Sequence, residues 1–181
     1  MKRNSEQILT EWLVLKAQSG DVRAMNLLVK EWHPKLLRYA SRQIRDEEAA
    51  KDVVQDTFMT VTKGIRKLND PAAFPRWIYQ ILHRRGVDYL RRKTRSRKND
   101  SFSAPVNRTL DENKTTKSLD IQRALRNLDS ASYQAIQLHY LDGFNLKEIS
   151  RITGVPEGTV KSRLYSARNN LRQLLGGKDH E

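Results

Sequence analysis

The amino-acid sequence predicts an all-α protein made of two small helical domains joined by a flexible linker. Apolar residues recur every three or four positions along most of the chain, and no segment alternates apolar and polar residues for long enough to indicate a strand. The 181 residues include only 8 glycines and 5 prolines, which favours helices over a β-sandwich. Residues 96–118 are dominated by polar and charged side chains that cannot bury enough apolar surface to order the segment, so we expect a linker there.

The first domain, expected over residues 1–95, begins with three helices. A turn at residues 19–21 should end the first helix, and Asp21 should cap the next, which reaches residue 32. Pro34 suits the first turn of a separate helix that continues to about Ile44. The first helix, residues 8–17, is indicated by apolar residues at helical spacing: Ile8, Leu9, Trp12, Leu13 and Leu15.

Two longer helices complete the predicted first domain. Acidic residues at 46–48 favour a helix start, because carboxylates are stabilised at the positive end of the helix dipole. Residues 69–71 should break this helix, and a last helix is expected from about residue 72 to 92. The apolar stripe of the helix at 46–68 comprises Val54, Phe58, Val61, Ile65 and Leu68.

The second domain, expected over residues 119–181, contains shorter helices. Ser130 and Asn145 are the expected caps of helices that reach Leu141 and Ile152. An earlier helix should cover 119–128, with Ile121, Ala124, Leu125 and Leu128 as its apolar residues. The last helix, 157–175, should turn inward Val160, Leu164, Ala167, Leu171 and Leu174.

Residues 146–164 have the spacing of a helix-turn-helix, with Gly154 at the turn and small Ser150 where the helices pack. Such a unit presents the start of its second helix to the major groove, although an ordinary helical hairpin is the alternative. Arg163 and Arg168 are better placed for phosphates than for bases. The candidate base readers are Thr159, Lys161, Ser162, Tyr165 and Ser166.

The formal net charge of +13 points to a polyanionic or acidic partner. Residues 83–98 and 145–175 are basic, whereas residues 46–56 are acidic, and each run taken alone could equally be a solvated helix face. The absence of cysteine excludes disulfides and thiolate chemistry and fits the cytoplasm. No apolar run is long enough for a membrane span, and the first residues do not have the pattern of a secretory signal.

Several motifs together resemble a bacterial sigma factor of the extracytoplasmic-function (ECF) group of the sigma-70 family. Each motif would be weak alone, but they follow one another in the order and spacing of that family, from about Leu13 to Leu175 apart from the linker. The motifs are DVVQDTF at 52–58, FPRWIY at 74–79, DYLRR at 88–92, and PEGTVKSRL at 156–164, followed by Ala167 and Arg168.

The resemblance implies a non-enzymatic initiation factor with sigma region 2 in the first domain and region 4 in the second. It implies binding to core RNA polymerase, through the clamp helices of the largest subunit and a region 4 contact on the other large subunit. The residues implied for the clamp helices share one helix face, with an acidic and amide character that favours orientation and on-rate: Asp52, Gln55, Asp56 and Met59.

The resemblance also implies promoter DNA as a partner, with the −10 element read by region 2 and the −35 element by region 4. Melted bases offer π-faces and free edges to aromatic and cationic side chains, although Trp77 could equally be a core aromatic. Arg84 and Ser166 depart from the common family pattern, so the preferred −10 and −35 sequences stay open. The implied −10 residues are Asn69, Asp70, Trp77, Gln80, Arg84, Arg85 and Arg91.

A further partner implied by the resemblance is an anti-sigma factor, which could hold the protein at the membrane, and a stress or envelope response is the expected regulon. No metal or cofactor is expected, because the four histidines lack ligand spacing and no phosphate-binding glycine loop is present. The main alternative is an autonomous dimeric helix-turn-helix regulator. A serine recombinase with Ser5 as nucleophile is a third hypothesis, and it would require an α/β domain.

Overall fold

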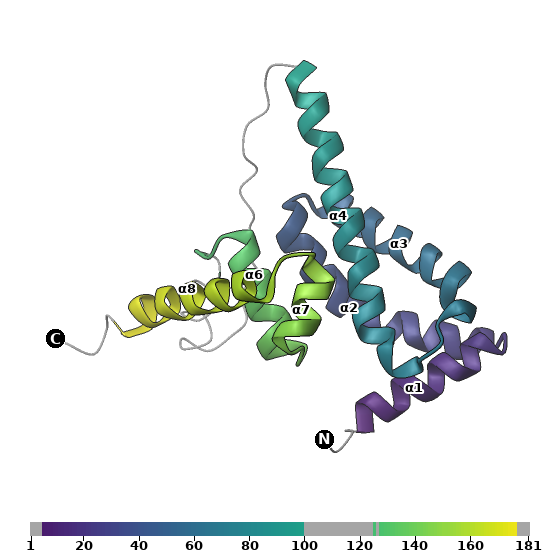
Figure 1. Ribbon diagram of the computed structural model, residues 1–181. Helices are drawn as coiled ribbons and strands as arrows, with labels where there is room; N and C mark the ends of the chain where they lie inside the picture. The colour runs from purple at the N-terminus through teal and green to yellow at the C-terminus, as the bar shows by residue number, and fades with distance from the viewer. Residues whose placement is uncertain (1–4, 100–124, 126, 177–181) are drawn as a thin grey trace, which may run out of the picture. The chain divides into compact units, whose positions relative to one another are not determined.

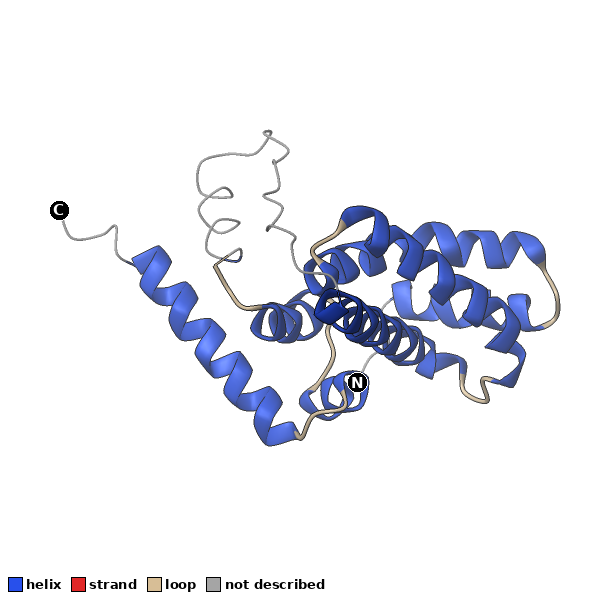
Figure 2. Ribbon diagram, turned by 90° about the horizontal axis from the view of Figure 1, so that it is seen from above, coloured by secondary structure: helices blue, strands red, loops and turns tan. Residues whose placement is uncertain are grey.

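The computed structural model describes residues 5–99, 125 and 127–176, and every regular element in that part of the chain is helical (Figures 1 and 2). The chain divides into two compact units, residues 1–102 and 103–181. The all-α prediction is therefore confirmed, and the described residues hold no strand on which a recombinase-type catalytic domain could be built. In the same residues, no helix combines the length and the apolarity that crossing a bilayer requires.

Between residues 5 and 99, the first unit consists of four α-helices and two short 3₁₀ turns. The elements are α1 (Ser5–Gln18), α2 (Val22–Ile44), α3 (Glu47–Gly64), η1 (Ile65–Lys67), η2 (Pro71–Ala73) and α4 (Phe74–Asn99). Asp21 caps α2 by accepting hydrogen bonds from the backbone N–H groups of Arg23 and Ala24, as its position predicted. Asp46 caps α3 in the same way through Ala49, and two glutamates follow it in the first turn.

The core of the first unit lies where α2, α3 and α4 pack on one another. Aromatic rings meet edge to face at its centre: Trp32 lies against Phe74 with ring centroids 5.6 Å apart, and Tyr39 lies against Tyr79 at 5.4 Å. Leu36 and Leu82 are fully buried beside them. This core fixes α4 against α3, and therefore fixes the two helices that carry the predicted site residues of the first unit.

Helix α1 buries a different face from the one that its larger apolar residues suggest. Thr10, Leu13, Val14 and Ala17 are buried, whereas Ile8, Leu9, Trp12 and Leu15 are each about half exposed or more. The buried face is the one that carries Leu13 and Val14, while Trp12 and the other large apolar residues remain exposed. Of the five residues that indicated this helix, only Leu13 belongs to the core.

The predicted helix break at Pro34 is wrong, because α2 continues through this proline to Ile44. A proline inside a helix removes one backbone hydrogen bond and costs about 3 kcal/mol. Here Leu28 and Trp32 before the proline and Leu36 and Tyr39 after it are buried on one continuous face. Burial of these side chains outweighs the local cost, so the helix is kept.

Helix α4 is longer than predicted, since it ends at Asn99 and not near Arg92. The first four residues of the expected linker, 96–99, belong to this helix, and the remainder of the linker lies outside the described residues. Figure 1 shows the end of α4 extending beyond the other helices of its unit.

The second unit is described from Leu125 onward, so most of the helix predicted at 119–128 lies outside the described residues. Its elements are α6 (Ser130–Ile136), the π-helical turn η3 (Gln137–Leu141), α7 (Leu146–Thr153) and α8 (Glu157–Gly176). The cap of α6 is Asp129, which accepts from the backbone N–H of Ser132 at 2.9 Å, and the prediction of Ser130 was one residue late. Val160, Leu164 and Ala167 are buried as expected, whereas Leu141 and Leu174 are about half exposed.

Candidate functional site

One face of α3 carries the residues predicted to bind polymerase. Asp52, Gln55, Asp56 and Met59 are all exposed, while Val53, Val54 and Phe58 are buried on the opposite side. Positions i, i+3, i+4 and i+7 of a helix lie in one row, so the four side chains form a continuous stripe. Two carboxylates, an amide and a thioether on one accessible row can meet basic and apolar groups of a partner.

A hydrogen-bonded cluster joins the two helices that carry the predicted sites. Asp46, at the start of α3, accepts from Lys93 of α4 at 3.0 Å and from the Tyr89 hydroxyl at 3.4 Å. The hydrogen bond from Lys93 and that from the backbone of Ala49 hold the pKa of the Asp46 carboxyl below its usual value. The same contact raises the pKa of Lys93, so both groups stay charged at neutral pH.

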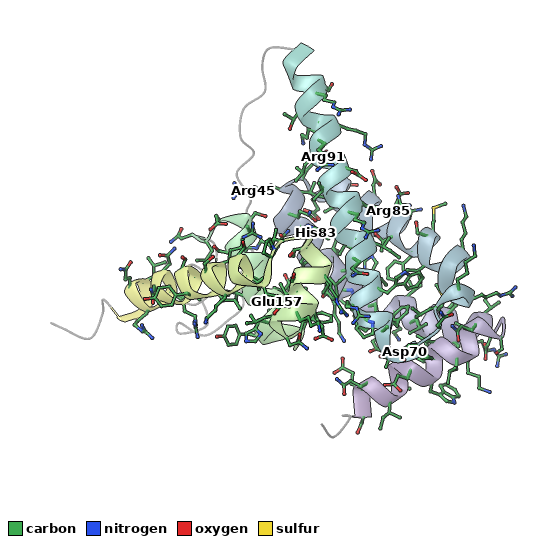
Figure 3. All side chains as sticks on the ribbon, viewed as in Figure 1. Arg45, Asp70, His83, Arg85, Arg91 and Glu157 are labelled. Atoms are coloured by element: carbon green, nitrogen blue, oxygen red, sulfur yellow. The ribbon has the colours of Figure 1, made fainter. Side chains whose placement is uncertain are left out.

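A pocket of about 500 Å³, open to solvent, lies at the connection between α3 and α4. Asp70 lies at its rim (labelled in Figure 3) and caps η2 by accepting from the backbone N–H of Ala72 at 3.0 Å. The wall is part aromatic, part polar and part cationic, and it brings together Gly64, Lys67, Leu68, Asn69, Asp70, Ala73 and Trp77. An unstacked base needs a π-surface and polar groups that reach its edge, and this pocket offers both.

The structure joins the two interpretations of Trp77. The indole is half buried and packs against Phe74 with ring centroids 6.2 Å apart, yet it also lines the pocket. A ring that is held on one side and accessible on the other is a rigid platform for stacking. Trp77 is therefore both a core aromatic and a candidate ligand contact.

Two residues that support this pocket escaped the sequence analysis. A Cβ at Gly64 would lie 3.2 Å from the Trp77 ring, so the glycine lets the indole rest on the end of α3. Gln18 of α1 donates hydrogen bonds to the carbonyls of Ile65 and Leu68, at 2.9 and 2.7 Å, and anchors the chain that forms the wall. An isolated glycine inside a helical pattern is a signal that could have revealed Gly64. The sequence contains no comparable signal for Gln18.

Most of the basic residues predicted for the −10 element share one side of α4. Arg84 and Arg91 are exposed, Gln80 is half buried, and these three lie in the same row as Trp77. Arg85, labelled in Figure 3, is different: its guanidinium lies 3.1 Å from Asp56 of α3 and also donates to Thr60. The structure thus pairs a residue predicted for DNA with one predicted for polymerase.

The helix-turn-helix is built by local hydrogen bonds of α7 and α8. Asn145 and Glu148 form a reciprocal capping box at the start of α7. Gly154 ends α7 with φ of 72°, a left-handed conformation that favours glycine. The Ser150 hydroxyl donates to the carbonyl of Val155 at 2.6 Å, so this residue also fixes the turn.

The predicted −35 residues begin in the first turn of α8 and continue along it. Thr159 and Arg163 are half buried, and Tyr165 is 61% exposed. Burial raises the pKa of the nearby Asp129 carboxyl, but hydrogen bonds from Ser132 and attraction to Arg163 outweigh it, so this pKa lies below its usual value. The other predicted residues, all exposed, are Lys161, Ser162, Ser166 and Arg168.

No group of three or more acidic or histidine residues in the described ranges could hold a metal ion. His33 stacks on Phe58, and Nδ1 of His83 lies 2.8 Å from the Tyr39 hydroxyl. Nδ1 of His139 lies 2.9 Å from the carbonyl of Phe144. These three histidines have structural partners, and His180 lies outside the described residues.

Two family models match the chain over ranges that correspond to the two units. Sigma-70 region 2 matches residues 28–96, and Sigma-70, region 4 matches residues 118–171. Among curated proteins, the ECF RNA polymerase sigma-E factor of Haemophilus influenzae is 28% identical over 185 residues, covering 94% of this chain and 97% of the relative. The protein of the same name from Escherichia coli K12 is also 28% identical, covering 92% of this chain and 94% of the relative.

Solved structures with a similar fold include two protein complexes. The sigma factor RpoE in complex with the anti-sigma factor NepR from Bartonella quintana has a TM-score of 0.71 and 25% identity, covering 87% of this chain and 99% of that one. CnrH in complex with the cytosolic domain of CnrY has a TM-score of 0.62 and 24% identity, covering 94% of this chain and 99% of that one, and shows likeness of fold.

Proposed function

The chain belongs to the ECF group of the sigma-70 family of RNA polymerase sigma factors, and we propose that its two units divide the tasks of promoter recognition. The first unit, with residues 1–95 as its domain, binds core polymerase and the −10 element. The second, with residues 119–181 as its domain, binds the −35 element and a second site on polymerase. The connecting segment follows Asn99. Polymerase performs the chemistry, and the chain supplies specificity and helps to open the duplex.

The exposed row on α3 is the proposed polymerase surface. Asp52, Gln55, Asp56 and Met59 are accessible along its whole length, and the hydrophobic side of the helix is already used by the core. An acidic row suits basic side chains on the clamp helices of the largest subunit. Because ion pairs formed there would be exposed, they would contribute more to orientation and association rate than to affinity.

The pocket beside Trp77 is the proposed binding site for an unstacked base of the −10 element. Asn69 and Asp70 at its rim can hydrogen-bond a base edge, and Trp77 can stack on its face. Gln80, Arg84 and Arg91 continue from the pocket along α4, where they can contact the adjoining strand. This arrangement supports recognition of melted DNA better than of an intact groove.

The exposed side of α8 is the proposed −35 surface. Lys161, Ser162 and Tyr165 begin in the first turns of the second helix of the helix-turn-helix, the part that enters the major groove in such motifs. Thr159 and Ser166 flank them as further base contacts, and Arg163 and Arg168 contact phosphates.

The main support for the proposal is that one chain contains both sigma regions. An autonomous dimeric regulator needs a helix-turn-helix and a dimer interface but has no use for the exposed α3 row or the base pocket. The solved relative bound to NepR supports an anti-sigma factor as a further partner of this chain. We place the protein in the cytoplasm, where polymerase and promoters are, and only such a partner would retain it at the membrane.

Charge reversal on α3 tests the polymerase surface. We expect Asp56→Arg to weaken binding to core RNA polymerase about 100-fold or more, mainly through slower association, because a cation would face the basic side chains of the clamp. Glu47→Arg is the matched control: it reverses an exposed acid of the same helix on a different side, and its affinity should change little. Both are measured by titrating labelled chain with purified core enzyme. Equal affinity of Asp56→Arg and the native chain would contradict the proposed surface.

A further inference from the structure

Arg85 links the proposed polymerase surface on α3 to the body of α4. Its Nη1 donates to Oδ2 of Asp56 at 3.1 Å, and its Nη2 donates to the hydroxyl of Thr60. The Thr60 hydroxyl in turn donates to the backbone carbonyl of Asp56 at 3.0 Å. One guanidinium therefore holds Asp56 at two points, directly through its carboxylate and indirectly through its backbone.

The helix geometry separates Arg85 from the residues proposed to contact DNA. Consecutive residues of an α-helix point about 100° apart, so Arg84 and Arg85 cannot serve the same surface equally. By helical spacing, Arg84 lies in the row of Trp77 and Arg91. Arg85 instead reaches α3, where its guanidinium contacts Asp56. A role for Arg85 in reading the −10 element would require it to leave two hydrogen-bond acceptors.

The contact does not have the properties of a pair that mainly stabilises the fold. The side chains of Arg85 and Asp56 are 38% and 56% exposed, and ion pairs in that environment contribute little to folding. The location of the pair indicates another role, because Asp56 lies in the middle of the exposed row on α3. A carboxylate held in one orientation loses less freedom when a partner binds it.

From this geometry we propose that Arg85 is a positioning residue of the polymerase surface, which orients the Asp56 carboxylate toward the basic groups of the clamp. The inference rests on the proposed function of the α3 row. It extends the polymerase surface across two helices and removes Arg85 from the set of −10 contacts.

The test measures the dissociation constant for core RNA polymerase and the −10 sequence selected by the holoenzyme. Arg85→Met keeps the aliphatic stem but removes the guanidinium. Arg92→Met is the matched control, because it removes one positive charge two turns further along the same side of α4. A cycle with Asp56→Asn measures coupling, and Arg85→Lys tests rescue. Circular dichroism verifies that each variant folds.

We expect Arg85→Met to raise the dissociation constant about tenfold in the native background. In the Asp56→Asn background the same substitution should cause no further increase, because the carboxylate that Arg85 orients is already absent. Arg92→Met should leave it unchanged, Arg85→Lys should recover part of the loss, and the selected −10 sequence should not change. Unchanged core affinity, an equal loss in Arg92→Met, or an altered −10 sequence would overturn the inference while native binding to core persists. Failure of the native chain to bind core polymerase would instead overturn the proposed function itself.

Discussion

At the scale of single residues, the packing of the first unit depends on two glycines on which side chains of other helices lie. Gly64 lies under the Trp77 ring, and Gly86 is buried against the Gln43 side chain. Neither residue has a left-handed backbone, so the absent Cβ is what matters at both positions. Each glycine interrupts a helical pattern and could be noticed in the sequence, but the sequence does not show which side chain packs on it, because Trp77 and Gln43 belong to other helices.

Gly64→Ala tests the base pocket with little disturbance of the fold. The new methyl group would press on Trp77 at 3.2 Å and tilt the indole. The free energy of unfolding should change by less than about 1 kcal/mol, because the higher helix propensity of alanine offsets the cost of the contact with Trp77. Binding of holoenzyme to single-stranded −10 DNA should weaken by about fivefold, a loss that corresponds to about 1 kcal/mol.

The matched control for Gly64→Ala is Gly158→Ala in α8, where an added Cβ would meet nothing within 4 Å. This variant should unfold at a slightly higher denaturant concentration and bind −10 DNA normally. If Gly64→Ala bound −10 DNA as tightly as the control, the pocket would not be the base site.

At the scale of helices, sequence patterns located the elements well but assigned some faces and ends wrongly. The caps at Asp21, Asp46 and Asn145 follow from local chemistry and were predictable. The continuation of α2 through Pro34 was not predictable. Burial of Leu36 and Tyr39 of α2 against other helices outweighs the local penalty of the proline. Apolar spacing also did not identify the buried face of α1, since Leu9 and Leu15 are exposed although they are as apolar as the buried Leu13.

Gly86→Ala tests the crossing of α2 and α4. The added Cβ would lie 2.2 Å from Oε1 of the buried Gln43 side chain, which donates to the carbonyl of His83. We expect a loss of about 1–2 kcal/mol in the free energy of unfolding, measured with urea. In a Gln43→Ala background the clash is absent, so the same substitution should stabilise by up to about 1 kcal/mol. The same loss in both backgrounds would contradict this account of the crossing.

The Asp46 cluster gives the connection of α3 and α4 a defined dependence on pH. Because folding lowers the pKa of Asp46, its stabilisation is present above the ordinary value of 3.8 and is lost as pH falls through the lowered pKa. Asp46→Asn retains a capping side chain but loses the charge that pairs with Lys93. The native chain and Asp46→Asn should differ in unfolding free energy by less than about 1 kcal/mol, because the pair of Asp46 and Lys93 is partly exposed. This difference should disappear in acid. A difference that persists unchanged to pH 2.5 in urea titrations would contradict the assignment.

At the scale of the whole molecule, the net charge of +13 conceals surfaces of different sign. The exposed acids of α3 suit a protein partner, whereas the cations of α4 and α8 suit DNA. Sequence motifs identified the family and both modules because these rest on local patterns. They could not reveal that Arg85 pairs with Asp56, or that Gln18 supports the pocket, because those contacts join residues far apart in the chain.

The most direct measurement of the central claim is transcription by core RNA polymerase from a promoter library with randomised −35 and −10 elements. The native chain should select both elements, and only together with core enzyme. Trp77→Ala should lose selection at −10 alone, and the double variant Lys161→Ala with Tyr165→Ala should lose it at −35 alone. Selection of one palindromic site by the free chain, or loss of both elements with either variant, would contradict the account.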